Sequence, residues 1–395
     1  MRSHNLALAL RVVTQADGPV SRTGIARTTG LTRASASTLV DALVAGGLLR
    51  EVPLPSTARS GRPATGLVPS PTGPLGLGLA VDVDALAVCL VGLDGTVHGQ
   101  EVLAGNVRGR PPEEVLARLT RAARQLVDGA PGPVCGATVA LPGLVHPDGE
   151  RLLRAPNLGW HDVPVLELLR RGDVLADLPL ALDNEADLAA LAEAGRSAGD
   201  FVYLSGEVGI GAGLVLDGTL HRGARGWSGE VGHLTVDRLG PRCGCGARGC
   251  LEQYAGTEVL LRRAGLPGPA TGSGAERLVE QALRGRRPVL TALDRAGHAL
   301  GLVLAGVVNL LDLDEVVLGG SLGPLAPWLT PPIEAELREH VLWAGLQVPT
   351  VRAATSGRHA VVVGAGLAAG TRVRDDPGGW LARTPARGRR DQIVS

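Results

Sequence analysis

The 395 residues suggest two or three domains, and 45% hydrophobic with only 2% aromatic residues predicts cores built from Leu, Val and Ala. A formal net charge of zero excludes a global field that would indicate nucleic acid or membrane as a partner, and the short, interrupted apolar runs argue against a membrane span. No signal peptide is predicted, and five cysteines without an export signal argue against a disulfide framework, so a cytoplasmic protein is expected.

Three helices are predicted within the first fifty residues. Residues 2–19 have the helical spacing of apolar residues and end in a Gly-Pro breaker. Residues 21–30 form a second, short helix with Ser21 as its N-cap, and residues 31–51 form a third, capped by Thr32. The tight, glycine-containing turn between the second and third helices is typical of a helix-turn-helix.

The N-terminal segment 1–72 is basic although the whole chain is neutral. It carries eight arginines against three carboxylates, a net charge of plus five, which is the footprint that phosphate binding requires. Segment 53–74 is rich in Pro, Ser, Gly and Arg and is either the wing of a winged helix with a linker or a basic flexible linker. The candidate DNA-binding residues are Arg22, Thr32, Arg33, Ser35, Ser37, Thr38, Arg59 and Arg62. The alternative is a small helical bundle that binds protein.

From Leu75 onward the pattern of strands and helices alternates. Residues 75–99 predict a β-hairpin with its turn at Asp94-Gly95, and strands and helices then follow in alternation. We expect two α/β lobes, residues 73–182 and 183–372, with a cleft between them. The arginine-rich segment 373–395 is predicted to be a disordered tail.

Residues 229–252, GEVGHLTVDRLGPRCGCGARGCLE, carry a candidate metal centre. His233, Cys243, Cys245 and Cys250 supply one imidazole and three thiolates, a set that favours tetrahedral zinc. Four protein ligands leave no open position for water, so the metal is predicted to be structural rather than catalytic. The alternative is a disulfide pair with one spare thiol.

Several motifs together resemble the ROK family of repressors, open reading frames and sugar kinases. They are GEVGH followed by CGCGARGCLE, the flanking GEVGIGAGLVLDGTLHRGARGWSGEVGH, and ALPGLV, APNLGW, DNEADLAALAEAG, EVVLGGSLG and SRTGIARTTGLTRASAS. The resemblance covers nearly the whole chain in the family's order. It implies an N-terminal all-α winged helix-turn-helix followed by an α/β two-lobed ROK domain with the actin-like ATPase and sugar kinase fold.

The resemblance also implies a sugar in the cleft. Asn184 and Glu185 match the family's Asn-Asp pair, whose carboxylate is the catalytic base in the kinases. The other positions that match sugar contacts are Glu230, His233 and Glu252, with Asn157 beside the pocket. Carboxylates and amides suit sugar hydroxyls, which both donate and accept hydrogen bonds. The structural alternatives are a helix N-terminus for Asn184 and Glu185 and a solvated face for Glu230 and Glu252.

Kinase chemistry is not expected. ROK kinases begin this domain with an Asp-x-Gly-Gly-Thr turn for ATP phosphates, whereas this chain has Asp82-Val83-Asp84-Ala85-Leu86. Asp84 would repel a triphosphate, and Glu185 is one methylene longer than the family's aspartate. Glycine-rich GIGAG and GGSLG are retained.

These observations predict a sugar-responsive transcriptional regulator, most often a repressor in this family, of carbohydrate uptake or catabolism genes. Its expected partners are double-stranded operator DNA, a sugar or sugar derivative, and a second copy in a homodimer or higher homo-oligomer, with no membrane. One structural Zn²⁺ per chain is expected. The alternatives are an ATP-dependent sugar kinase with an accessory DNA-binding domain and a zinc-stapled protein-interaction module.

Overall fold

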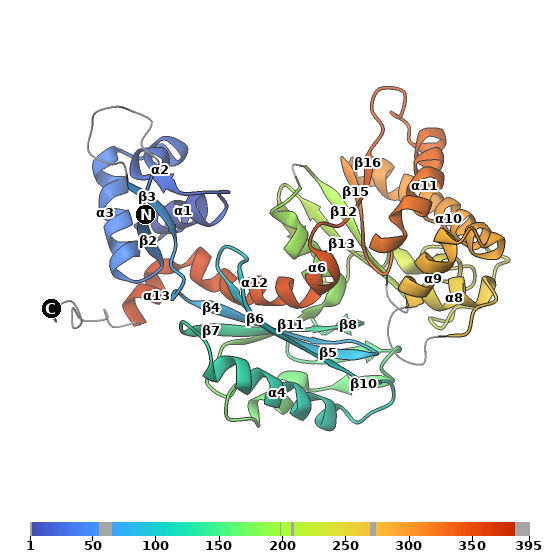
Figure 1. The fold of residues 1–395 in the computed structure, drawn as a ribbon, viewed down its shortest axis with the longest axis horizontal. Coiled ribbons are helices and arrows are strands. Elements are labelled where there is room, and N and C mark those ends of the chain that lie inside the picture. Colours follow the sequence, from blue (N-terminus) through green and yellow to red (C-terminus); the bar gives the residue numbers. More distant parts are fainter. Residues whose placement is uncertain (1, 55–64, 198, 207–208, 269–273, 384–395) are drawn as a thin grey trace.

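The computed structural model describes residues 2–54, 65–197, 199–206, 209–268 and 274–383. Three bodies follow one another along the long axis of the molecule (Figure 1). A small helical domain lies at one end, a first α/β lobe at the centre and a second α/β lobe at the other end. Each α/β lobe has its own five-stranded sheet.

The N-terminal domain is a winged helix. Ser21 caps the second helix by accepting a hydrogen bond from Gly24 N at 3.0 Å, and Thr32 caps the third by accepting one from Ser35 N at 3.2 Å, so both predicted caps are confirmed. Gly30 has φ +71°, the left-handed conformation that lets the turn between these helices close. The elements are α1 Arg2–Thr14, β1 Val20–Ser21, α2 Arg22–Thr29, α3 Arg33–Ala45, β2 Leu49–Pro53 and β3 Thr65–Pro69.

The first lobe is a sheet of order β11-β7-β4-β5-β6, covered on one face by α4 and α5. The predicted turn at Asp94-Gly95 joins β5 to β6, but a further turn at 82–84 joins β4 to β5, so segment 75–104 has three strands instead of the predicted two. Its elements are β4 Leu75–Val81, β5 Ala85–Gly92, β6 Val97–Ala104, α4 Pro112–Asp128, β7 Val134–Leu141, β8 Leu144–Val145, β9 Leu152–Ala155, β10 Trp160–Val163, α5 Val165–Arg170 and β11 Leu180–Asn184.

The second lobe repeats this topology in the order β14-β13-β12-β15-β16. Its core joins the sheet to helices α7 to α11. Helix α10 is long and apolar enough to span a membrane, but 67% of its most apolar window is buried in the lobe, as in a core helix. The elements are β12 Phe201–Gly206, β13 Ile210–Leu216, β14 Thr219–His221, η1 Val231–His233, α7 Glu252–Ala255, α8 Thr257–Arg263, α9 Gly274–Leu283, α10 Arg287–Leu311, β15 Glu315–Gly320, η2 Gly323–Leu325, α11 Ala326–His340, β16 Thr350–Ala353 and η3 Gly357–His359.

Two helices fill the space between the sheets. Helix α6, Glu185–Ala194, packs against β13, and α12, Ala360–Asp375, lies along β4, β5 and β7 (Figure 1). The expected lobe boundary therefore needs correction, because strand β11 and helix α12 pack with the first sheet although both reach into residues 183–372. The apolar face of a helix does not reveal from local sequence which of two sheets it covers.

The expected disordered tail is also corrected over residues 373–383. Helix α12 continues to Asp375, and α13, Pro377–Arg383, packs on α1 of the winged helix. Trp380 and Leu381 join the hydrophobic cluster of that domain, and Ser3 donates a 2.6 Å hydrogen bond to Asp376. Trp380 and Leu381 dock this short helix because they pack against the buried apolar residues of the winged helix. Residues 384–395 lie outside the described part of the chain.

Candidate metal centre and ligand cleft

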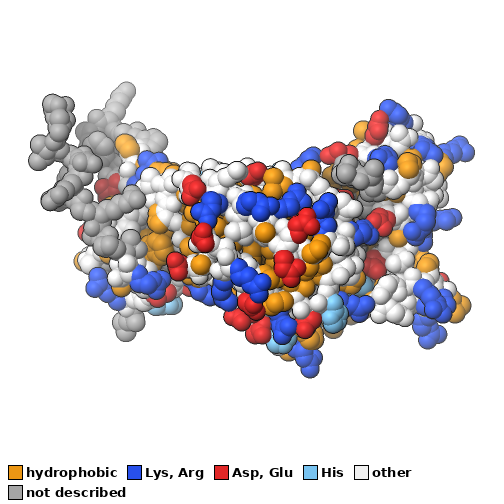
Figure 2. Space-filling view, turned by 90° about the horizontal axis from the view of Figure 1, so that it is seen from below, with side chains coloured by type: hydrophobic (Ala, Val, Ile, Leu, Met, Phe, Trp, Pro, Cys, Tyr) orange, Lys and Arg blue, Asp and Glu red, His pale blue; other side chains and the backbone are white. Residues whose placement is uncertain are grey.

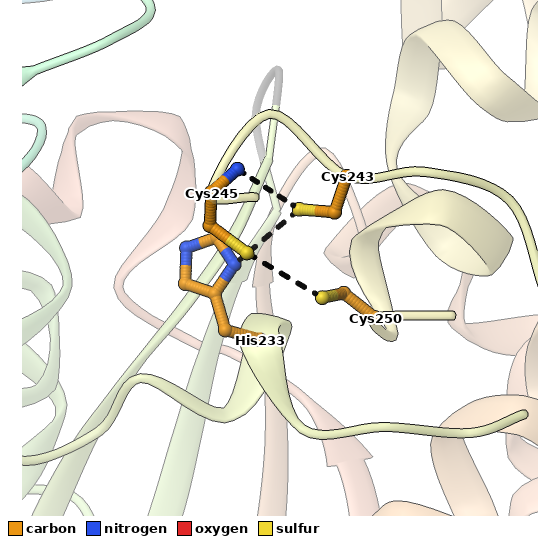
Figure 3. A group of neighbouring side chains, drawn as sticks. All are labelled: His233, Cys243, Cys245 and Cys250. Atoms are coloured by element: carbon orange, nitrogen blue, oxygen red, sulfur yellow. Dashed lines mark hydrogen bonds between the residues drawn. The ribbon is translucent and has the colours of Figure 1, made fainter. Parts of the chain in front are cut away.

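The four predicted metal ligands converge at one point of the second lobe (Figure 3). Cys243 Sγ lies 3.7 Å from His233 Nδ1, and Cys245 Sγ lies 3.7 Å from Cys250 Sγ. All four candidate ligand atoms lie within 4.8 Å of one another. Ligands about 2.3 Å from a tetrahedral ion stand about 3.8 Å apart, so this cluster has the size and donor set of a closed tetrahedral metal centre.

The loop between Cys243 and Cys250 is folded to present its sulfur atoms inward. Cys243 N donates to Ala247 O at 2.9 Å, and Cys245 N points at Cys243 Sγ at 3.4 Å. Burial raises the pKa of the Cys243 and Cys250 thiols, whereas a hydrogen bond from the Ala247 backbone lowers the pKa of Cys245. Because a cation stabilises neighbouring thiolates, a metal ion would supply the positive charge that this partly buried cluster of three sulfurs lacks.

We call residues 229–252 the metal loop, and two of its glycines hold it against the second sheet. Gly229 has φ +88°, and its carbonyl accepts a hydrogen bond from Ala212 N at 3.0 Å. A Cβ at Gly229 would collide with the Ala212 carbonyl, and one at Gly232 would collide with the Ile210 carbonyl. The glycines of GEVGH therefore let η1 lie directly against β13, which fixes the position of His233.

Predicted sugar contacts from both lobes meet beside the metal cluster. The Nε2 atom of His233 lies 3.7 Å from Glu230 Oε2, while Nδ1 faces Cys243. Glu252 Oε1 lies 2.8 Å from Cys243 Sγ, so this carboxylate also touches the cluster. A Cβ on Gly209 would lie 3.1 Å from Glu252 Oε2 and 3.8 Å from Asn157 Nδ2, which places Asn157 of the first lobe opposite Glu252 of the second.

Asn184 has a structural role. Its Oδ1 accepts a hydrogen bond from Ala186 N at 2.8 Å and caps α6, and its Nδ2 donates to Gly143 O at 3.0 Å. The helix-cap alternative therefore describes Oδ1, whereas Nδ2 binds the Gly143 carbonyl of the first lobe, and a role in sugar binding stays a prediction. Burial, followed by the neighbouring Asp82 charge, raises the pKa of Glu185 to about 8.

The first-lobe turn 82–84 differs from a phosphate cradle. The N–H of Val83 donates to Asp82 Oδ1 at 2.6 Å, and the N–H of Asp82 donates to Ala85 O at 2.9 Å. Both backbone donors are therefore engaged within the turn and do not point at a ligand. Burial raises the pKa of Asp82, and the neighbouring Asp84 charge adds to the shift, so two carboxyl groups lie close together at this turn.

Sequence reasoning missed a buried acidic cluster next to the predicted sugar edge. Arg222 donates to Asp183 Oδ1 at 2.6 Å and lies 3.7 Å from Asp187 Oδ2, linking the second lobe to the first. Asp187 is 2% exposed, and among described atoms its Oδ1 has no hydrogen-bond partner. Burial raises the pKa of Asp187 to about 7, with Asp183 and Glu230 contributing. The three acids of DNEAD, residues 183–187, indicate such a cluster in the sequence, but their partner Arg222 is distant in the chain.

Five of the eight predicted DNA contacts lie at the start of α3. Arg22 donates to Asp41 at 2.6 Å and to Glu51 at 2.7 Å, so it ties the winged helix together internally. Arg59 and Arg62 lie outside the described residues. The remaining candidates lie at the start of α3, exposed except for half-buried Ser37, and they are Thr32, Arg33, Ser35, Ser37 and Thr38.

A winged helix followed by two lobes of repeated topology defines a protein of the actin-like sugar kinase fold that also carries a helix-turn-helix module. The ROK family profile matches residues 77–371, and the MarR family profile matches residues 7–60. The chain belongs to the ROK family and carries an N-terminal winged helix of the MarR type.

Known relatives include both regulators and kinases. The chain is 29% identical over 324 residues to the xylose repressor of Caldicellulosiruptor bescii, covering 76% of this chain and 79% of that one. A crystallised ROK family transcriptional regulator, a homologue of the Escherichia coli MLC protein, is 25% identical with a TM-score of 0.77 and covers 98% of this chain and 99% of its own. A ROK family glucokinase from Streptomyces griseus, in complex with glucose and AMPPNP, is 25% identical with a TM-score of 0.62 and covers 74% of this chain and 98% of its own.

Proposed function

We propose that this protein is a sugar-responsive, DNA-binding repressor of carbohydrate uptake or catabolism genes. The observation that carries the proposal is the extent of the match. The ROK regulator structure covers 98% of the chain, including the winged helix, whereas the glucokinase structure covers 74%. A winged helix with an exposed recognition-helix start is the part that a kinase does not need.

The metal of the Cys₃His cluster is inferred to be zinc, in a structural role. Three cysteines and one histidine at tetrahedral spacing suit Zn²⁺, and four protein ligands leave no position for a reacting water. The ion would hold the loop on which His233 lies, with Nε2 free to face the sugar and Glu230. Zinc thereby positions ligand-binding side chains and takes no part in a reaction.

Loss of kinase activity is part of the proposal. The turn 82–84 carries two carboxylates and no glycine, and Val83 N–H is engaged by Asp82. Glu185 is one methylene longer than the aspartate that serves as the base in the family's kinases, and this displaces its carboxylate from the position of that base. The alternative, an ATP-dependent sugar kinase with an accessory DNA-binding domain, rests on the glucokinase relatives and the retained glycine-rich segments.

The proposed mechanism by which sugar binding changes DNA binding rests on contacts between the two lobes and between the C-terminal helices and the winged helix. The cleft is bridged by Trp227 Nε1, which donates to Val145 O at 2.7 Å, and by the Arg222–Asp183 pair. A sugar that engages Asn157 and Glu252 together favours the closed arrangement of the lobes. Helix α12 lies between the lobes and leads into α13, whose Leu381 packs in the winged-helix cluster, so closure is transmitted to the DNA-binding domain. A homodimer on a palindromic operator is expected.

The test combines DNA selection with a sugar screen. Double-stranded DNA selected from a random pool by the purified protein serves as the operator, and fluorescence anisotropy measures its dissociation constant with and without xylose, glucose and N-acetylglucosamine. Arg33→Ala should weaken operator binding about tenfold, the value of one good contact, while Arg171→Ala on the first lobe should leave it unchanged. Equal operator affinity of the two variants would show that Arg33 does not contact DNA.

A separate variant tests the response of operator binding to sugar. Glu230→Ala should abolish the sugar response while leaving operator affinity unchanged. ADP release from ATP in the presence of the same sugars, at rates typical of sugar kinases, would instead establish the kinase alternative.

A further inference from the structure

A wide groove in the second lobe is lined in part by Val236 of the metal loop, and none of the predicted sugar contacts is among its lining residues. It encloses about 940 Å³ and is formed by α10 together with α7, α8 and α11. Its apolar floor includes Val236 of the metal loop, Ala292 and Leu302. Its polar lining includes three arginines of the second lobe. We call this feature the arginine groove and define it by Tyr254, Arg263, Arg287, Thr291 and Arg295.

The positive charge of the arginine groove is not balanced by its surroundings. Within the described residues Arg287 and Arg295 make no ion pair, and Arg263 donates only to the carbonyl of Gln253 at 3.2 Å. The one carboxylate on the lining, Glu336, is held by His298 at 2.6 Å and contacted by His340 at 3.2 Å. Basic side chains are prominent at this end of the molecule in Figure 2.

Arg263 shows that the cluster is electrostatically strained. Its guanidinium lies over the ring of Tyr254, 5.1 Å from the ring centroid, which fixes its direction. Burial lowers the pKa of Arg263, and the charges of Arg295 and Arg262 lower it further. Like charges held close together without a counter-charge are stabilised when an anion binds between them.

We propose that the arginine groove binds a small phosphorylated metabolite, a phosphate ester of a polar molecule such as a sugar. Guanidinium groups bind phosphate oxygens through paired N–H donors, and the Thr291 hydroxyl adds a further donor. Helix α10 begins at Arg287 without a side-chain cap, so the positive end of a 25-residue helix dipole also lies at this groove. The volume is that of a small-molecule pocket.

A second copy of the chain is a poorer occupant. A twofold contact centred on the groove would bring both sets of Arg263, Arg287 and Arg295 together, and repulsion among six guanidinium groups would oppose it. A dianionic phosphate supplies the missing charge without this penalty. The groove therefore matches a small anion better than a copy of itself.

The position of the groove gives the ligand a regulatory consequence. Tyr254 lies two residues after Glu252 in α7, and Val236 lies between His233 and Cys243 in the metal loop. A ligand in the arginine groove thus contacts the back of the loop whose front carries the predicted sugar contacts. This inference adds a second effector to the proposed function and does not depend on DNA binding.

The test measures binding of two probes to the full-length, metal-loaded protein. Isothermal titration calorimetry and thermal shift compare glucose 6-phosphate and inorganic phosphate with glucose and with sodium chloride at equal ionic strength. Glucose 6-phosphate should bind and raise the Tm beyond the chloride control. The double variant Arg263→Gln/Arg295→Gln should weaken this binding at least tenfold, and the double variant Arg284→Gln/Arg338→Gln, which removes two exposed arginines elsewhere on the same lobe, should not.

Further outcomes distinguish ester binding in the arginine groove from ester binding in the cleft and from self-association. Glu230→Ala should keep phosphate-ester binding, because the arginine groove is separate from the sugar edge, so failure of the sugar proposal alone would leave this result intact. Ester binding lost in Glu230→Ala but retained in Arg263→Gln/Arg295→Gln would place the ester in the cleft and overturn the proposal. Equal affinity for inorganic phosphate would overturn the assignment to an ester. Loss of self-association in Arg263→Gln/Arg295→Gln, without any phosphate binding to wild type, would assign the groove to a second copy.

Discussion

The two lobes share one topology and differ at the same turn. In each, a three-stranded antiparallel meander continues into two parallel strands. In the first lobe the turn after the first strand is Asp82-Val83-Asp84, with its backbone donors engaged internally. In the second lobe β12 ends at Gly206 and β13 begins at Ile210, and a Cβ on Gly209 would lie 3.1 Å from Glu252 Oε2 and 3.8 Å from Asn157 Nδ2.

The surroundings of the two turns also differ. In the second lobe Gly209 lies next to Glu252 and Asn157, and the four candidate metal ligands lie together in the same lobe. In the first lobe the turn carries Asp82 and Asp84 and no glycine. Under the proposed function, this contrast corresponds to a sugar site that is kept and a phosphate site that is lost.

The largest expected effect is loss of the metal. Cys250→Ser should abolish stoichiometric zinc measured by mass spectrometry, together with sugar binding, because the buried Cys250 sulfur is one of four ligands. Wild type treated with a chelator should lose about 4 kcal/mol of unfolding free energy if free zinc had exceeded its Kd a thousandfold. Cys135→Ala, a buried cysteine beside the first sheet, is the control and should retain the metal. Normal sugar affinity in the metal-free protein would contradict the account.

The second largest expected effect is loss of the ion pair between Glu193 and Arg352. Glu193 is fully buried and accepts hydrogen bonds from Arg352 at 2.6 Å and from the backbone of Thr355 and Ser356. Glu193→Ala should lower the free energy of unfolding at pH 7 by about 2–3 kcal/mol in urea unfolding, because the N–H groups of Thr355 and Ser356 lose their buried acceptor, although Arg352 keeps Glu315. The half-exposed pair of Arg222 and Asp183 should cost far less when broken, and equal costs would refute this ranking.

The pH dependence of Glu193 has a defined sign. Burial alone would raise the pKa of Glu193, but the hydrogen bonds from Arg352 and the backbone outweigh it and lower the pKa below 4.5. Its stabilisation is therefore complete above pH 4.5 and is lost as pH falls through the lower folded-state pKa. The difference in stability between wild type and Glu193→Ala should shrink in that acid range.

Glu185→Gln should have the opposite pH dependence. Because burial and Asp82 raise the pKa of Glu185 to about 8, the folded protein is penalised as pH rises from 4.5 towards 8. The Gln variant should melt at a higher temperature than wild type at pH 8 and at the same temperature at pH 4.5. A variant that melts lower at pH 8 would show that the Glu185 carboxylate is stabilised by a partner.

The smallest expected effect is a partial repair of the first-lobe turn. Asp84→Gly/Ala85→Gly restores two glycines and removes one carboxylate, but Val83 N–H stays bound to Asp82. Calorimetry should give a dissociation constant for AMPPNP still above about 1 mM, equivalent to about −4 kcal/mol. Micromolar affinity for AMPPNP in this variant would mean that only these two residues prevent nucleotide binding at the first-lobe turn.

Local signals in the sequence predicted part of this structure. The caps Ser21 and Thr32 and the Cys₃His quartet lie within short segments, so spacing alone identified them. The sequence places residues 360–372 in the second lobe and 373–383 in a disordered tail, whereas α12 packs on the first sheet and α13 on the winged helix, because the packing partners of both helices lie hundreds of residues away. The Arg222–Asp187 contact and the arginine groove likewise assemble from separate elements, and no single segment contains their pattern.

Operator affinity measured with and without sugar, while ADP is monitored in the same sample, tests the central claim most directly. The account predicts that one sugar weakens operator binding at least fivefold in wild type but not in Glu230→Ala, with no ADP formed from ATP. Operator affinity unchanged by sugar, accompanied by sustained ADP production, would contradict it.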